Sequence, residues 1–415
     1  DGALPMIYTN ASGTVAESLY GRATKAAAYA LKARVLLYAA SPLFNGNADY
    51  AKFANEDGTL LFAPKDDSKW GKAAAAAKEA IDKIEGSSYY GLYYSDEPDN
   101  GYRNYMELFL PSKKWNKEYI FARNQGTGYS DNIHQEKCMA ANGMGGWSGL
   151  CPTQELVDAY EMANGSTPII GYNADGTPII NGASGYSETG FAATAGKHYP
   201  AGVYNMYVGR EPRFYASINF NGQQWRGRQL EFWQGGKDGI NVSKVDYCCT
   251  GYLLRKTADE GVDVINGKGG MKEASILFRV GSLYLDYAEA LNEAEGPVDD
   301  VYKYVDAIRK RAGLPGLAKG LDKDKMRERI QHERQIELAF EAGHRYFDCH
   351  RWKIAEKTDN GYMHGMNITA TNKVDYSKRS TVGDSRVFEK KHYLFPIPQS
   401  EMDKRIGLVQ SPYWE

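Results

Sequence analysis

Apolar residues recur at helical spacing through the first 86 residues of the chain. Two helices are expected there, one over residues 16–40 and one over residues 68–86. Their apolar positions are Leu31, Val35 and Tyr38 in the first helix, and Trp70, Ala73, Ala74, Ala77, Ile81 and Ile84 in the second. Ser41-Pro42 ends the first helix, Ser68 is a suitable N-cap for the second, and Gly86 ends it. The pattern predicts an antiparallel pair, the unit of a helical repeat.

Helical spacing returns at residue 275. Its two stripes are Leu277, Val280, Tyr284, Tyr287, Ala288 and Leu291, and then Val298, Val301, Val305, Ile308 and Ala312. Gly296-Pro297 and Gly313 end the two helices, and the segment YLDYAEALNEA is similar in pattern to a tetratricopeptide helix. A third helix is expected from about Lys323 to Lys357, followed by an irregular tail.

Residues 87–270 have little sustained helical periodicity and contain most of the Gly, Asn and Trp. A short helix is expected over residues 153–161, and short strands in RFYASINFNG and GYLLRK. A tract this irregular suits a functional, loop-rich region. The chain is therefore divided into residues 1–86, 87–270 and 271–415 of one compact unit. The predicted fold is mainly α, with a tetratricopeptide-like helix-pair scaffold that carries an irregular, loop-rich ligand-binding subdomain.

The composition narrows the choice of partners. Lys and Arg number 50 and Asp and Glu 52, without a basic cluster, so no nucleic-acid partner is expected. The 31 Tyr and 44 Gly favour a broad surface built from loops, although many of the tyrosines can equally complete a core. No apolar run has membrane-spanning length, and the first residues do not resemble a signal peptide. Either the chain is cytoplasmic, or its export signal lies upstream of residue 1.

The five cysteines do not form a C-x-x-C motif, so neither a zinc site nor a redox motif is predicted, and no cofactor is expected. Cys138 and Cys151 are one candidate pair for a disulfide in an oxidising compartment. The adjacent Cys248 and Cys249 are expected to be two thiols, because a bridge between neighbours is strained.

Seven segments in order resemble the SusD/RagB family. They are residues 21–44, 152–165, 210–222, 250–256, 278–296, 332–352 and 393–414. The last two, HERQIELAFEAGHRYFDCHRW and YLFPIPQSEMDKRIGLVQSPYW, are the most specific. The resemblance differs in two respects: the family's N-terminal segment with a lipidated cysteine has no counterpart here, and Glu211 stands where Asp is common.

The resemblance implies a non-catalytic protein on the outer surface of the outer membrane, anchored through a lipid on that N-terminal segment. It further implies binding of nutrient glycans and delivery to a TonB-dependent, SusC-like transporter. A helical-repeat scaffold that binds peptides or proteins is the alternative.

A glycosidase that uses Glu337 and Glu341, four residues apart on one helical face, is a further alternative. Arg334, Arg345 and Arg351 lie within a few turns and are expected to keep these carboxylates ionised, which a general acid cannot be. A buried ion-pair network is therefore the preferred interpretation. The start of a zinc-protease motif at His332-Glu333 fails, because Ile336 stands where the second His is needed.

The candidate ligand-binding residue is Trp147, which lies after Asn142 between the glycines of GMGGWSGL and the start of the next expected helix. A loop indole suits stacking on the apolar face of a sugar, although a tryptophan tucked under its own loop is as reasonable. Tyr129 and Asn142 are expected to assist, and Trp225 and Trp233 are weaker candidates.

Overall fold

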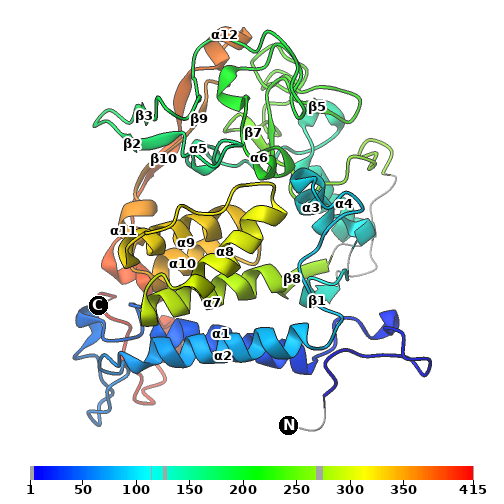
Figure 1. Cartoon of the computed structure of the whole chain (residues 1–415). Helices are drawn as coiled ribbons and strands as arrows, with labels where there is room; N and C mark the ends of the chain where they lie inside the picture. Colours follow the sequence, from blue (N-terminus) through cyan, green and yellow to red (C-terminus); the bar gives the residue numbers. More distant parts are fainter. Residues whose placement is uncertain (1–3, 114, 125–128, 268–273, 415) are drawn as a thin grey trace.

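The computed structural model describes residues 4–113, 115–124, 129–267 and 274–414. Helices lie in layers in the lower part of the molecule, and a loop-rich part lies above them (Figure 1). Every sheet in these residues is an antiparallel pair of strands, so the helices provide the scaffold. None of the helices in this described part combines the length and the apolar character that a membrane span requires.

The scaffold is a stack of helix pairs. Its helices are α1 (Lys25–Ala40), α2 (Ser68–Glu85), α7 (Val280–Glu295), α8 (Asp299–Arg311), α9 (Lys323–Glu337), α10 (His344–Arg351) and α11 (Ala355–Thr358). Helix α2 packs between α1 and α7, and α7 packs in turn against α8 and α9. This arrangement confirms the predicted mainly α, tetratricopeptide-like fold.

The buried face of α1 differs from the predicted one. Leu31 and Val35 are 52% and 55% exposed, whereas the alanines of the opposite face, such as Ala30 and Ala33, are buried. Small side chains allow the backbones of two helices to approach closely, and α1 therefore turns its alanine face to α2. An apolar strip consequently remains on the surface.

The predicted helix from Lys323 to Lys357 is broken after Glu337. Phe340, Ala342 and Gly343 have φ values of 63°, 41° and 72°, so the chain passes through the left-handed region and starts α10 in a new direction. Lys256 stabilises the break, because its Nζ donates to the carbonyls of Glu337 (3.2 Å) and Ala339 (2.8 Å) at the end of α9.

The loop-rich part contains short elements. They are α3 (Gly101–Leu108), β1 (Tyr119–Asn124), α4 (Tyr129–Met139), α5 (Gln154–Ala159), β2 (Ile169–Tyr172), β3 (Pro178–Ile180), α6 (Pro212–Ser217), β4 (Ile218–Phe220), β5 (Gln224–Trp225), β6 (Arg228–Gln229), β7 (Tyr252–Leu254) and β8 (Ala274–Arg279). The strand pairs are β1 with β8, β2 with β3, β4 with β7, and β5 with β6. This part has an aromatic core of its own, in which Tyr207, Phe214 and Phe220 are fully buried.

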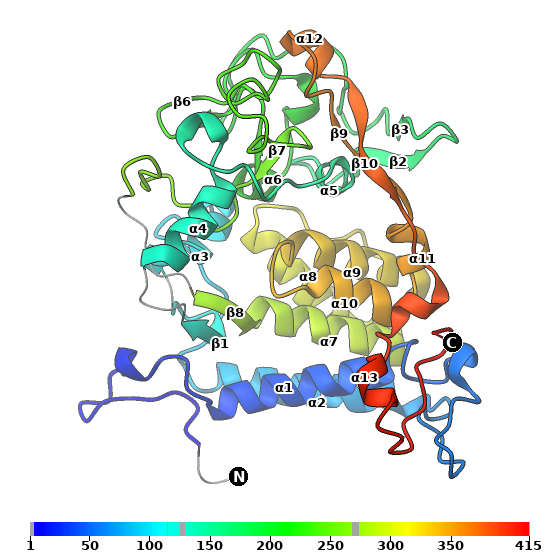
Figure 2. The ribbon, with the colours of Figure 1, turned by 180° about the vertical axis from the view of Figure 1, so that it is seen from behind.

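The C-terminal region contributes to both parts. A ribbon of β9 (Gly361–Met366) and β10 (Arg379–Arg386), with α12 (Lys373–Tyr376) between them, rises from the scaffold to the loop-rich part (Figure 1). Arg379 fastens it there by pairing with Asp158 at 2.7 Å. The chain then returns to the scaffold through α13 (Gln399–Met402), so that both termini lie in the lower part of the molecule (Figure 2).

Candidate functional site

The loop that carries Trp147 is folded back on the end of α4. The backbone N–H groups of Trp147 and Gly149 donate to the carbonyls of Lys137 (2.6 Å) and Cys138 (2.9 Å). Gly146 makes this fold possible, because a Cβ at this position would lie 2.1 Å from the carbonyl oxygen of Ala140. The loop is therefore a rigid platform.

The indole of Trp147 is 37% exposed on this platform. It packs against His134, with the ring centroids 5.2 Å apart, and the Nζ of Lys137 lies 5.1 Å from the ring centroid. These contacts fix the orientation of the ring while part of its surface stays open to solvent. A fixed, partly exposed indole is suited to stacking against a flat apolar ligand surface.

Asn142 joins this loop to the loop of residues 231–241. Its side-chain Nδ2 donates to the carbonyl of Gly239 at 3.1 Å, its Oδ1 accepts from the N–H of Gly143 at 2.9 Å, and the residue is 9% exposed. The two loops are in close contact, because a Cβ at Gly143 would lie 2.0 Å from the carbonyl oxygen of Lys237. The structure therefore gives the Asn142 amide a positioning role within the loop.

A surface hollow of about 520 Å³ adjoins the Trp147 loop, a volume within the usual range for small-ligand clefts. It is lined by Gly143 and Met144 of that loop, by Arg226 and Gly227 of the turn between β5 and β6, by Arg228 of β6, and by residues 260–265. Strand β6 and helix α4 lie on the same flank of the loop-rich part (Figure 2). Three segments distant in sequence thus converge on this hollow, and one of them is the loop that carries Trp147.

The β5–β6 turn carries a backbone feature that favours a role in this hollow. Arg226 has a φ of 45°, which is uncommon for a residue with a side chain, and the following Gly227 has a φ of 85°. Arg226 is held by an ion pair with Glu136 of α4 at 2.9 Å and donates to the carbonyl of Asp259 at 2.7 Å. One guanidinium therefore joins α4, the turn and the third wall of the hollow.

The remaining predicted residues lie in different settings. Trp225 is 2% exposed and lies between the guanidinium groups of Arg226 and Arg255, which are 5.5 Å and 4.7 Å from its ring. Trp233 is half-buried against the aromatic core. Tyr129 is the first residue of α4, and its side chain lies outside the described residues. The charged residues that line the hollow were missed by sequence reasoning; they are Arg226, Arg228, Glu260 and Asp263. The Arg-Gly pair in QQWRGRQ, which is typical of a turn, was the available signal.

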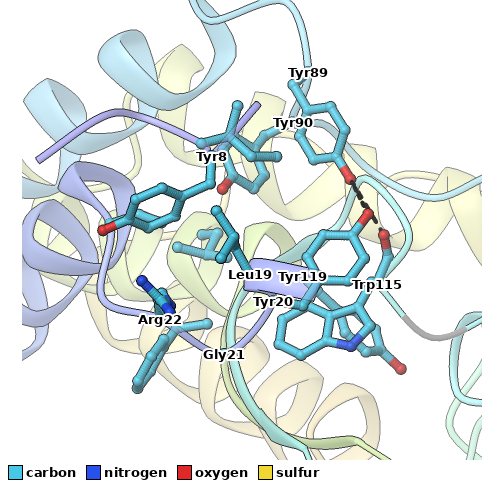
Figure 3. A pocket seen from close by; sticks show the side chains of 13 residues that line it. Tyr8, Leu19, Tyr20, Gly21, Arg22, Tyr89, Tyr90, Trp115 and Tyr119 are labelled. Atoms are coloured by element: carbon cyan, nitrogen blue, oxygen red, sulfur yellow. Dashed lines mark hydrogen bonds between the residues drawn. The ribbon is translucent and has the colours of Figure 1, made fainter. Parts of the chain in front are cut away.

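A second group of aromatic residues, from the first 22 residues and residues 89–121, surrounds a narrow cavity (Figure 3). Tyr20 stacks on Trp115 with centroids 4.5 Å apart, and the hydroxyl of Tyr89 donates to the carbonyl of Trp115 at 3.2 Å. The cavity measures about 20 Å³, room for a water molecule but not for a sugar ring. This group fastens the N-terminal segment to the scaffold.

An apolar groove runs along the scaffold between α1 and α10. It consists of two hollows of about 420 and 160 Å³ that share Tyr38 and Phe347. The exposed Val35 borders one hollow and Phe395, which is 77% exposed, borders the other. An exposed apolar surface of this kind is typical of contacts with another macromolecule, because it offers few partners to sugar hydroxyls.

Glu337 lies in a buried ionic cluster, which we define as Glu118, Arg213, Arg279, Arg311 and Glu337. The carboxylate of Glu337 accepts from Arg279 at 2.9 Å, from Arg213 at 3.1 Å and from Arg311. Glu118 pairs with Arg279 at 2.7 Å and with Arg311 at 3.1 Å. The five side chains come from β1, α6, β8, α8 and α9 or their borders, so the cluster connects scaffold and loops.

The cluster explains why Glu337 and Glu341 are poor glycosidase carboxylates. Burial raises the pKa of Glu337, but the Arg311, Arg279 and Arg213 charges outweigh it and lower the pKa to about 2. Burial likewise raises the pKa of Glu341, but Arg279 and Lys256 lower it to about 2. A general acid needs a raised pKa and access to the substrate. Glu337 has a lowered pKa and no exposed surface.

The arginines predicted to surround these carboxylates were the wrong ones. Arg334 and Arg351 pair with Asp348, at 2.8 Å each, in a separate buried network. Arg345 is half-buried and makes no ion pair with a described residue. Glu341 also lies beyond the end of α9, so the two carboxylates do not share a helical face. Within the described residues, no group of three or more His, Cys, Asp or Glu is arranged to hold a metal ion.

The family model for the SusD family matches residues 111–414. SusD-like protein P25 of Formosa agariphila is 42% identical over 82 residues, which is 19% of this chain and 15% of that protein. The solved structure of BT4246 has a TM-score of 0.80 and 28% identity, covering 99% of this chain and 73% of that one. A SusD-like protein (BF3747) from Bacteroides fragilis has a TM-score of 0.68 and 27% identity, covering 99% and 68%.

The family match extends over most of the chain, and the structural likeness extends over nearly all of it. The matched residues include α4, the Trp147 loop and the hollow beside it, as well as the cluster around Glu337. The chain therefore belongs to the SusD family.

Proposed function

We propose that this protein binds nutrient glycans at the cell surface, with Trp147 and the adjoining hollow as the binding site. Membership of the SusD family supports carbohydrate binding in nutrient uptake. The observation that carries the location is the fixed, 37% exposed Trp147, whose loop contributes Gly143 and Met144 to the lining of a hollow of about 520 Å³. An indole supplies a flat stacking surface, and the polar residues of the hollow supply partners for hydroxyl groups.

The contributions of the other candidates differ within this proposal. Asn142 acts by holding the loop, because its amide is already bonded to Gly239 and Gly143. Trp225 supports the turn that carries Arg226, while Trp233 and Tyr129 remain candidates. We add the four charged residues that line the hollow, which are Arg226, Arg228, Glu260 and Asp263.

The test is Trp147→Ala, compared with Tyr362→Ala as the matched control. Tyr362 is a 53% exposed aromatic residue on β9, outside the hollow. A glycan array identifies a ligand for the unmodified protein, and calorimetry then measures its affinity for each variant. We expect Trp147→Ala to lose about 1–3 kcal/mol of binding free energy, by analogy with aromatic–base stacking. The melting temperature of both variants is expected to change little.

Two outcomes would contradict the proposal. Unchanged affinity of the Trp147→Ala variant would remove the indole from the site. Equal losses in Trp147→Ala and Tyr362→Ala would show a general effect of surface aromatics.

We further propose that the protein delivers its ligand to a TonB-dependent, SusC-like transporter and is held at the outer membrane by a lipid anchor. The exposed apolar groove between α1 and α10 favours a protein partner, because Val35 and Phe395 are open to solvent. Co-purification of the native protein from outer membranes tests this proposal. Repeated recovery without a transporter of this class would contradict it.

The same groove keeps a peptide- or protein-binding scaffold as the second candidate function. The two candidates are separated by the glycan array. The second candidate would be favoured if the protein bound no glycan on the array but bound peptides, and if Val35→Asp abolished the peptide binding.

A further inference from the structure

Both guanidinium groups in the lining of the hollow are already paired with buried carboxylates. Arg226 pairs with Glu136 at 2.9 Å, and Arg228 forms two bonds of 2.7 Å with Asp238. The side chains of Glu136 and Asp238 are 3% and 0% exposed, and neither belongs to the lining. An anionic ligand in the hollow therefore meets two arginines whose charge is already neutralised.

The two carboxylates of the lining, Asp263 and Glu260, differ in their surroundings. Asp263 accepts from the backbone N–H of Asn266 at 3.1 Å and from its side-chain Nδ2 at 2.6 Å. Glu260 is exposed, and it forms no hydrogen bond or ion pair with any residue that the structure describes. The carboxylate of Glu260 therefore has both oxygen atoms available to a ligand in the hollow.

The segment that carries Glu260 is fixed on both sides of this residue. Arg226 donates to the carbonyl of the preceding residue, Asp259, at 2.7 Å. Val262 and Val264, which follow Glu260, are 4% and 5% exposed and belong to a small apolar cluster. Because this backbone is already ordered, a ligand that binds to Glu260 does not have to immobilise the wall of the hollow.

We propose, on the basis of the glycan-binding function proposed above, that the hollow selects uncharged glycans and that Glu260 determines this selection. Two neighbouring hydroxyl groups of a sugar donate to the two oxygens of the Glu260 carboxylate, and hydrogen bonds to a charged acceptor are stronger than those to a neutral one. The same carboxylate repels a glycan that carries a carboxylate or a sulfate at this point, because like charges brought together in a binding site disfavour the complex.

Lys137 is the positive group that opposes this selection. Its Nζ lies 5.1 Å from the centroid of the Trp147 ring, and the residue does not belong to the lining of the hollow. An anionic glycan attracted by Lys137 would carry its charge beside the indole, whereas Glu260 acts within the hollow. The two residues therefore predict opposite preferences, and a variant of each distinguishes them.

The test begins with an array of neutral, uronate-containing and sulfated oligosaccharides, on which we expect the tightest ligand to be uncharged. Calorimetry then compares this ligand with its own derivative in which the C6 hydroxyls have been oxidised to carboxylates. We expect the oxidation to weaken binding to the unmodified protein at least about tenfold. Glu260→Gln, which keeps the size of the side chain, should bind the uncharged ligand roughly tenfold more weakly and lose less affinity on oxidation.

Glu328→Gln is the matched control, because Glu328 is an exposed glutamate of α9 outside the hollow. It is expected to bind both ligands as the unmodified protein does. An acidic oligosaccharide as the tightest ligand, with binding that Lys137→Gln abolishes, would overturn the proposal. Identical behaviour of Glu260→Gln and Glu328→Gln would overturn it equally.

The same measurements distinguish a failure of this selection from a failure of the proposed function. If Trp147→Ala weakens binding and Glu260→Gln does not, the binding site stands and only the role of Glu260 is refuted. If no oligosaccharide on the array binds, the glycan-binding function itself is refuted, and the selection is refuted with it.

Discussion

Replacing Glu337 by Gln tests whether the buried cluster holds the scaffold and the loops together. The substitution keeps the size of the side chain but removes the charge on which Arg213, Arg279 and Arg311 converge. The pKa of Glu337 falls from 4.5 to about 2, which corresponds to a preference of about 3 kcal/mol for the charged carboxylate. Breaking a buried pair typically costs a similar amount, about 3–5 kcal/mol. We therefore expect Glu337→Gln to lose about 3 kcal/mol of unfolding free energy.

The assay is urea unfolding at pH 7, with Glu328→Gln as the matched control. Glu328 lies on the same helix, α9, but is exposed. We expect the control to change the free energy of unfolding by less than about 0.5 kcal/mol. Since the folded pKa of Glu337 is lowered, its contribution is complete above about pH 4.5 and is lost as the pH falls towards 2. The difference between the unmodified protein and Glu337→Gln must shrink over that window.

Equal stability of Glu337→Gln and Glu328→Gln would refute the reasoning. It would mean that other groups neutralise the three arginines when the Glu337 charge is removed. If the difference in unfolding free energy between the unmodified protein and Glu337→Gln stays constant down to about pH 2, the electrostatic explanation is refuted. The loss of stability would then come from altered packing.

Three further predictions follow from other parts of the structure. Burial, together with the charges of Arg34 and Arg334, lowers the pKa of His344 in the folded protein to about 3. As the pH falls below 6.5, the histidine is therefore protonated in the unfolded chain but stays neutral in the folded one. The folded state consequently loses about 2 kcal/mol of stability by pH 5. Between pH 7.5 and pH 5, the free energy of unfolding measured in urea should fall by about 2 kcal/mol less in His344→Gln than in the unmodified protein. An equal fall in both proteins would contradict this prediction. Gly143→Ala should lower the free energy of unfolding by about 1–3 kcal/mol and weaken glycan binding, because the added Cβ would lie 2.0 Å from the carbonyl oxygen of Lys237. No change in either quantity would show that the two loops separate freely. Incubation with bound oligosaccharides should release no reducing ends, and a steady release that Glu337→Gln abolishes would restore the glycosidase interpretation.

The regular elements of the scaffold were predictable because their signals are local. Helix α2 runs from Ser68 to Glu85, and α8 from Asp299 to Arg311, close to the predicted ranges. The orientation of α1 was not predictable from its own sequence, because both its alanine face and its Leu31–Val35 face have helical spacing. Only the presence of α2 decides which face is buried.

The ionic cluster and the hollow depended on distant residues, which spacing along the chain cannot reveal. Arginines near Glu337 in sequence were expected as its partners, whereas Arg213, Arg279 and Arg311 from three other elements provide the charge. Trp147 was recognised as a candidate because an aromatic residue between glycines is a local signal. Arg226 was not, because its significance lies in an unusual backbone angle and in the neighbours that the fold brings to it.

The position of the Glu337 cluster bears on how this fold can be redesigned. Its five members lie at the ends of regular elements or beside them, outside the segments 142–149, 226–241 and 259–265. The hollow is lined by residues 143–144, 226–228 and 260–265 within these segments, so the residues that we propose to contact the ligand are separate from those of the ionic cluster. A grafting experiment that exchanges the three segments together, and leaves the five charged residues in place, should change the glycan preference while preserving the fold.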